Sequence, residues 1–126
     1  MGHAMKRPSK YGAKPTTITH KGEEVRCASR AEAKRFGELI LLLRARKIDD
    51  LQFHPRFPLY AFDPETNAIT KVATYVADAS YIELGKVARV TVEDIKGMAT
   101  ETFKLKAKWF RACYPEIDFR VLKVRA

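Results

Sequence analysis

The chain of 126 residues is long enough for one domain, and its hydrophobic content of 46% can supply a core at this size. Its longest apolar run, residues 39–43, is too short for a bilayer, and the polar, basic N-terminus lacks a signal-peptide pattern, so we expect neither a membrane protein nor a secreted one. With 24 Lys and Arg residues against 15 Asp and Glu residues, the net charge of +9 is typical of nucleic-acid-binding domains, although many small proteins are basic for solubility alone.

The N-terminal segment, residues 1–15, is predicted to be a flexible basic arm ahead of a single domain over residues 16–126. Its opening, MGHAM, resembles an expression-vector remnant and is given no function. Lys10 and Lys14 lie in this arm among proline and glycine residues. Basic arms often contact nucleic-acid phosphates and often have no binding role, so the arm alone does not decide the function.

A hairpin and a helix are predicted to follow the arm. Residues 16–26 carry β-branched residues on both sides of a Lys-Gly turn, which indicates a short hairpin. The segment S29-R-A-E32 is a capping-box pattern, and we expect a helix from there to about Lys47. Glu32 shares its face with the apolar residues of this helix, so it lies at the N-terminal end of the buried face, where capping alone would also explain it.

Three extended segments are predicted before a second helix: residues 52–62, 69–82 and 87–96. Residues 48–51 are interpreted as a turn. The prolines of the first segment favour an edge strand, and the second segment is expected to be one long strand. A turn over residues 83–86 joins the second and third strands into an antiparallel hairpin.

The second helix is predicted from about Thr100 to Tyr114, with a final strand over residues 117–124. Its inward stripe is expected to consist of Phe103, Ala107, Phe110 and Tyr114. Lys104, Lys108 and Arg111 form a basic stripe about 90° away, using 100° per residue. Leu105 and Trp109 lie opposite the inward stripe, so they are either covered by another element or form a homodimer contact.

The order helix, three strands, helix, strand predicts an α/β fold, an α+β arrangement in which a mixed sheet has a helix on each face. The last strand returns after a helix, so it can pair parallel to one of the others.

The stretch V92-E-D-I-K-G97 ends an apolar strand on three charged residues. Alternation places Asp94 and Lys96 on one face and Glu93 on the other, where Glu93 is interpreted as solvated. Across the predicted hairpin, Asp78 lies opposite Asp94 to within a few residues. Two carboxylates that close either share a proton or hold a divalent cation, and a neighbouring lysine can then orient water or stabilise a phosphate charge. The competing interpretation is an ion pair between Asp94 and Lys96 at a fraying strand end.

These residues, in this order, resemble the PD-(D/E)XK nuclease superfamily, and more closely a group of short phage-encoded proteins that are similar to TnsA-type transposon endonucleases. The segments that carry the resemblance are K10-Y-G-A-K14, S29-R-A-E-A-K-R-F36, L51-Q-F-H-P-R-F57, T74-Y-V-A-D-A-S-Y81, V92-E-D-I-K-G97 and F103-K-L-K-A-K108. The residue before Asp78 is Ala77, where the superfamily commonly has proline. The resemblance implies a restriction-endonuclease-like αβββαβ core.

The resemblance also implies a Mg²⁺-dependent endodeoxyribonuclease, with Mn²⁺ as the alternative ion. Asp78 and Asp94 match the two metal-binding acids, and Glu32 matches a helix glutamate that binds the ion directly or through water. The backbone carbonyl of Ile95 is implied as a further ligand, and Lys96 matches the lysine near the attacking water. Glu32, Asp78, Asp94 and Lys96 are therefore the candidate catalytic residues.

Basic residues near this set are the candidate DNA contacts, namely Lys104, Lys106, Lys108, Arg111, Arg35, Lys10 and Lys14. The expected partners are DNA, a second copy of the chain, and a recombination or packaging protein, with no membrane. We expect a cytoplasmic location in a bacterial host, with a phage or prophage gene as the source. Two alternatives stay open: a nucleic-acid-binding module without catalysis, and a subunit that acts only with a partner.

Overall fold

The computed structural model describes residues 16–124, and the predicted arm with Lys10 and Lys14 lies outside this range. The elements in chain order are β1 (Thr16–His20), β2 (Glu23–Cys27), α1 (Arg30–Arg44), β3 (Ile48–Phe53), β4 (Arg56–Asp63), β5 (Ala68–Val76), β6 (Ala79–Glu83), β7 (Arg89–Lys96), α2 (Glu101–Cys113) and β8 (Asp118–Lys123). Within residues 16–124, no helix is long and apolar enough to cross a bilayer.

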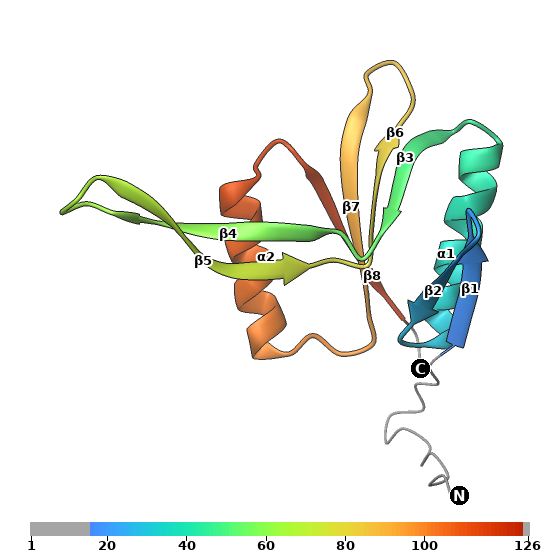
Figure 1. Cartoon of the computed structure of the whole chain (residues 1–126), viewed down its shortest axis with the longest axis horizontal. Helices are drawn as coiled ribbons and strands as arrows, with labels where there is room; N and C mark the ends of the chain where they lie inside the picture. Colours follow the sequence, from blue (N-terminus) through green and yellow to red (C-terminus); the bar gives the residue numbers. More distant parts are fainter. Residues whose placement is uncertain (1–15, 125–126) are drawn as a thin grey trace, which may run out of the picture.

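The central sheet has four strands in the order β3-β6-β7-β8. Strands β3, β6 and β7 pair antiparallel, whereas β7 and β8 pair parallel because α2 intervenes and returns the chain in the same direction. Helices α1 and α2 lie on opposite sides of this sheet (Figure 1). The predicted mixed sheet with a helix on each face is therefore confirmed, and the predicted order of helix, three strands, helix and strand holds for this core.

Two of the three predicted strands were wrong in their bounds. Residues 48–51, interpreted as a turn, belong to β3, and the predicted segment 69–82 is split into β5 and β6. The polar pair Asp49-Asp50 made this segment resemble a turn in the sequence. The pair lies at a β-bulge in β3, where Asp50 has a φ of 49°. His54, with a φ of 53°, separates β3 from β4. As a result, β4 and β5 form a separate two-stranded hairpin that projects from the body (Figure 1).

The core lies in two layers, one on each side of the central sheet. On the α1 side, Phe36 and Leu39 pack against Ala79 and Tyr81 of β6. On the α2 side, Phe110 is wholly buried with Val92 of β7 and the base of the β4–β5 hairpin. Because neighbouring residues of a strand point to opposite faces, β7 contributes side chains to both layers of the core.

Helix α2 confirms its predicted inward stripe, since Ala107 and Phe110 are buried and Phe103 and Tyr114 are half-buried. Leu105 and Trp109, predicted on the opposite side of the helix, differ in their surroundings. The Trp109 Nε1–H donates to the Tyr60 carbonyl at 2.8 Å, so the projecting hairpin covers this side chain. Leu105 is 63% exposed.

Candidate metal centre

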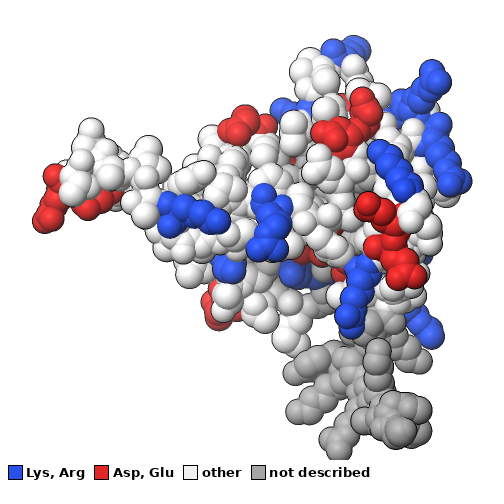
Figure 2. Space-filling model, viewed as in Figure 1, with Lys and Arg blue, Asp and Glu red and all other residues white. Residues whose placement is uncertain are grey.

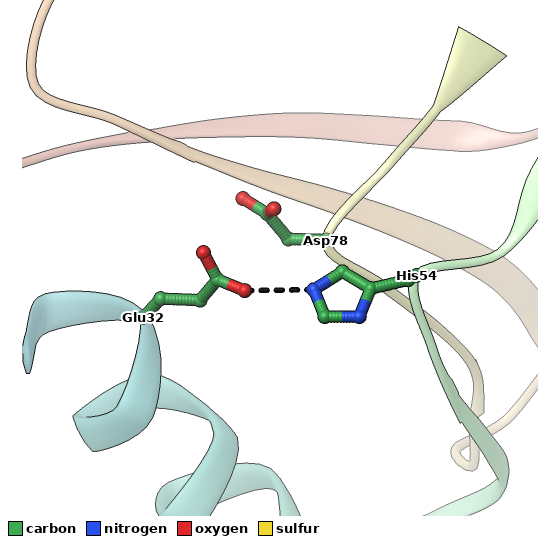
Figure 3. Close-up of side chains that lie close together, drawn as sticks. All are labelled: Glu32, His54 and Asp78. Atoms are coloured by element: carbon green, nitrogen blue, oxygen red, sulfur yellow. Dashed lines mark hydrogen bonds and ion pairs between the residues drawn. The ribbon is translucent and has the colours of Figure 1, made fainter. Parts of the chain in front are cut away.

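The predicted acids meet where α1 begins, β6 begins and β7 ends. Figure 3 shows Glu32, His54 and Asp78 pointing toward one another from α1 and from the segments that flank β3 and β6. One possible ligand atom from each of these three side chains lies within 4.8 Å of the others. Three segments that are far apart in the sequence therefore bring two carboxylates and an imidazole to one point.

Glu32 caps its helix and also faces the cluster. Its backbone N–H, otherwise unpaired at the start of α1, donates to Ser29 Oγ at 3.2 Å, and its Oε2 accepts from the N–H of Ala28, the residue before the N-cap, at 3.2 Å. Its other carboxylate oxygen, Oε1, lies 2.9 Å from His54 Nε2. The side chain is almost wholly buried. Capping and a role in the site are thus compatible for this residue.

Asp78 lies in the break between β5 and β6, beside the end of β7. Ala79 pairs with Glu93, so the next step along the two strands brings Asp78 alongside Asp94. The Asp78 N–H donates to the Glu93 carbonyl at 3.1 Å, which fixes this position. The predicted neighbourhood of the two aspartates across the hairpin is confirmed.

The environment of Asp78 disfavours its negative charge. Its carbonyl accepts from the His54 N–H at 2.9 Å, and its Oδ2 accepts from the Ile95 N–H at 2.6 Å. Burial, followed by the charges of Asp94 and Glu32, raises the pKa of Asp78 to about 8, although the Ile95 hydrogen bond opposes the rise. A divalent cation among these oxygens would reverse that balance, because it favours the ionised carboxylates.

The ion pair of the competing interpretation is present, since Lys96 Nζ lies within 3.2 Å of Asp94, but Asp94 is only 1% exposed, so the pair does not lie at a solvated, frayed strand end. Its Oδ2 accepts a hydrogen bond from the Tyr75 hydroxyl of β5, and burial together with this carboxylate raises the pKa of Tyr75. Its Oδ1 lies 3.2 Å from Lys96 Nζ but has no hydrogen-bond partner within residues 16–124. Lys96 Nζ also lies 4.5 Å from the centre of the Phe103 ring. The Lys96 ammonium is thus the ion-pair partner of this buried oxygen, and a bound cation would share or replace that contact.

The donor set fits a hard divalent ion. Within the three-residue group, Glu32 and Asp78 offer carboxylate oxygens, which Mg²⁺ and Mn²⁺ prefer, and His54 adds an imidazole that Mn²⁺ accepts readily. Asp94 is not part of that group, but it lies alongside Asp78 across the hairpin and would add a further carboxylate. The N–H of Ile95 binds Asp78, while its carbonyl stays a predicted ligand.

His54 is the member of the cluster that the sequence prediction left out. The signal was faint: a histidine between Phe53 and Pro55, with no periodicity to place its ring. Its left-handed backbone conformation turns the ring toward Glu32, and non-glycine residues seldom adopt this conformation. Tyr75 was also missed, because its position depends on the β4–β5 hairpin being separate from the central sheet, which was not predicted.

The interpretation of Glu93 as solvated was wrong. Alternation does place it on the face opposite Asp94, but α1 covers that face, and Glu93 is fully buried. Arg35, a predicted DNA contact, donates from Nε and Nη2 to the two Glu93 carboxylate oxygens at 2.8 and 2.7 Å. The Tyr81 hydroxyl donates to the same carboxylate. The Arg35 guanidinium is therefore engaged inside the protein.

The candidate DNA contacts of α2 differ in their surroundings. Lys104, Lys108 and Arg111 are exposed, and Lys104 pairs with Glu101 one turn away at 3.3 Å. Lys106 is half-buried and its Nζ donates to the Thr74 carbonyl at 3.4 Å. Figure 2 shows basic side chains spread over the body of this face and acidic side chains at the tip of the projecting hairpin.

Comparison with family models gives a match over residues 8–125 to a family described as "Protein of unknown function (DUF1064)". Neither the curated proteins nor the solved structures give a match.

Proposed function

Since the chain belongs to the DUF1064 family, whose description assigns no activity, we propose from the site itself that the protein is a metal-dependent DNA endonuclease that hydrolyses phosphodiester bonds. The observation that carries the proposal is the meeting of half-buried Asp78 with buried Asp94, beside Lys96 and Glu32. Carboxylates that repel one another away from solvent destabilise the metal-free protein, and cation binding would explain why they are placed together. The resemblance to PD-(D/E)XK nucleases supports the same reaction.

Asp78, Asp94 and Glu32, with the carbonyl of Ile95, would hold Mg²⁺ or Mn²⁺. When bound, the ion would polarise the phosphate and lower the pKa of a water molecule. The protein contributes the geometry: Asp78 is fixed by the backbone of Ile95 and Glu93, and Asp94 by the Tyr75 hydroxyl. These side chains therefore stand in place before any ligand arrives.

Lys96 supplies the positive charge of the site. Its Nζ is held between Asp94 Oδ1 and the Phe103 ring, so its amine is fixed beside the carboxylates without being buried. From there it can orient the attacking water or stabilise negative charge on the phosphate during hydrolysis.

DNA as the substrate is supported by charge. The net charge of +9 favours binding to a phosphate backbone, and Lys104, Lys108 and Arg111 are exposed on α2. The resemblance to phage and transposon proteins supports the processing of phage or mobile-element DNA, duplex or branched, in the cytoplasm of a bacterial host.

A second candidate is a subunit that acts only in a recombination or packaging complex. The β4–β5 hairpin favours it, because this hairpin projects from the body and carries exposed apolar side chains (Figure 1). These side chains are Tyr60, Phe62, Ile69 and Val72. Apolar residues gathered on one exposed element often mark a contact with another protein. In that case the isolated chain would bind DNA and metal but cut poorly.

The proposal is tested with supercoiled plasmid and a four-way DNA junction, each incubated with Mg²⁺, Mn²⁺ or EDTA. We expect cutting with either ion and none in EDTA. Tight DNA binding with no cutting under either ion would favour the binding module or the partner-dependent subunit. Little DNA binding at low salt would contradict every nucleic-acid function considered, since this charge should give at least non-specific binding.

The His54→Ala variant is expected to bind Mn²⁺ about tenfold more weakly than the wild type, because the variant loses an imidazole that contacts Glu32 and points into the cluster. Mg²⁺, which prefers oxygen ligands, should be affected less. Calorimetric titration of both ions measures the difference. The matched control is His20→Ala, which removes a half-buried imidazole that meets the Phe53 ring edge to face. Equal losses for the two ions would mean that His54 only orients Glu32.

A further inference from the structure

Arg35 and Glu93 form a bidentate, largely buried ion pair between α1 and the sheet. The Arg35 Nε and Nη2 donate to Glu93 Oε1 and Oε2 at 2.8 and 2.7 Å, and the Tyr81 hydroxyl also donates to Oε2. Glu93 is fully buried, whereas about a quarter of the Arg35 side chain is exposed. Both carboxylate oxygens therefore have donors, and the planar guanidinium fixes the direction as well as the distance of the contact.

The pair joins the two parts of the proposed metal centre. Arg35 follows Glu32 by three residues on α1, so both side chains lie on one face of the helix. Glu93 directly precedes Asp94 on β7, and its carbonyl accepts the Asp78 N–H at 3.1 Å. The contact between Arg35 and Glu93 thus links the helix that carries Glu32 directly to the strand that carries Asp94.

On the Asp78 side, His54 already connects the two parts, because its Nε2 lies 2.9 Å from Glu32 Oε1 and its N–H donates to the Asp78 carbonyl at 2.9 Å. Helix α1 packs against β1, β2 and β3 and, through Phe36 and Leu39, against β6, whereas β7 lies beyond β6 in the sheet. The Arg35 side chain reaches across β6 to β7, and Tyr81 of β6 binds the same carboxylate on the way. One polar cluster therefore connects α1, β6 and β7, the three elements at which the proposed ligands meet.

We propose that Arg35 and Glu93 are positioning residues that hold Glu32 at the correct separation from Asp78 and Asp94 for metal binding; this inference rests on the proposed function. Stability alone does not explain the pair, because well-packed apolar residues of similar volume often replace a buried ion pair without loss of stability. What apolar residues cannot replace is the fixed orientation that the two parallel hydrogen bonds impose.

The test compares stability with metal affinity in one variant. The triple substitution Arg35→Met, Glu93→Leu and Tyr81→Phe replaces the polar cluster by apolar residues and leaves none of its three members as an unpaired buried group. Its thermal midpoint in EDTA should stay close to that of the wild type, while its Mn²⁺ affinity by calorimetry should fall at least about tenfold. The paramagnetic resonance spectrum of bound Mn²⁺ should broaden, since the ligands are less well fixed.

The control variant carries Arg120→Met and Glu83→Leu, which remove a partly exposed ion pair of 3.0 Å between β8 and β6. Its Mn²⁺ affinity should equal that of the wild type. The single substitution Arg35→Lys keeps the charge but loses the bidentate contact, so its Mn²⁺ affinity should also fall. This variant tests the positioning role if the triple variant does not fold. Wild-type affinity in a folded variant would overturn the positioning role alone. Absence of Mn²⁺ binding by the wild type would overturn the proposed function itself.

Discussion

Replacing Asp94 with asparagine is expected to abolish DNA cleavage, with a fall of about a thousandfold or more, and to remove measurable Mn²⁺ binding. Asp94 is the most enclosed of the proposed ligands, and its Oδ1 lies 3.2 Å from Lys96 Nζ. Asparagine keeps the shape of the side chain and an oxygen that can accept from the Tyr75 hydroxyl, but it removes the charge that would hold the cation. Cleavage of supercoiled plasmid and calorimetric titration of Mn²⁺ measure the two losses.

The same reasoning applies to Asp78→Asn, with an added effect on stability. Burial and the neighbouring carboxylates raise the pKa of Asp78 to about 8, so its charge is unfavourable in the metal-free protein. Asparagine removes that charge and can still accept from the Ile95 N–H, so the thermal midpoint in EDTA should equal or exceed that of the wild type. A variant that is at least as stable yet inactive separates function from folding.

The control for both substitutions is Asp63→Asn, the same chemical change at the exposed end of β4. It should cut DNA and bind Mn²⁺ as the wild type does. Full cleavage by Asp94→Asn would contradict the proposed role of this carboxylate and point to a contaminating nuclease.

The sequence predicted both helices well because their signals are local. Ser29 and Thr100 cap the helices, and each hydroxyl accepts from the backbone N–H three residues later. The strands between the helices were harder, because their limits depend on contacts that are distant in sequence. Asp50 and His54 adopt left-handed conformations that distort or end β3, and the residue types alone do not predict these conformations. The long apolar run through residue 78 concealed the break at which β5 leaves the body and β6 enters the sheet.

The candidate site divides in the same way. The closeness of Asp78 and Asp94 follows from one hairpin and the alternation of side chains, so a sequence can predict it. The burial of Glu93 follows from α1 covering that face, and its partner Arg35 lies 58 residues away along the chain. His54 reaches Glu32 from 22 residues away, through a backbone turn with no repeat pattern. The sequence alone therefore supports the acids and the lysine, whereas the residues that position them emerge only from packing.

Replacing Lys96 with methionine is expected to reduce cleavage about a thousandfold while metal binding is kept. The aliphatic part of the side chain can still lie against Phe103, so the end of β7 should not rearrange. Lys96 Nζ lies 3.2 Å from Asp94 Oδ1, where it competes with a cation for that oxygen. Mn²⁺ affinity should therefore stay equal or increase, in contrast to its loss in Asp94→Asn.

This opposite response of affinity and cleavage is what identifies Lys96 as a group that acts on the reaction. Single-turnover cleavage and Mn²⁺ titration, made on the same preparation, measure both quantities. Lys71→Met, on the exposed surface of β5, removes the same charge away from the centre and should change neither. If Lys96→Met lost Mn²⁺ binding together with cleavage, the role of the lysine would be to hold Asp94 in place, and other residues would act on the water or the phosphate. If it cut DNA as fast as the wild type, the contact between Asp94 and Lys96 would be a structural ion pair only.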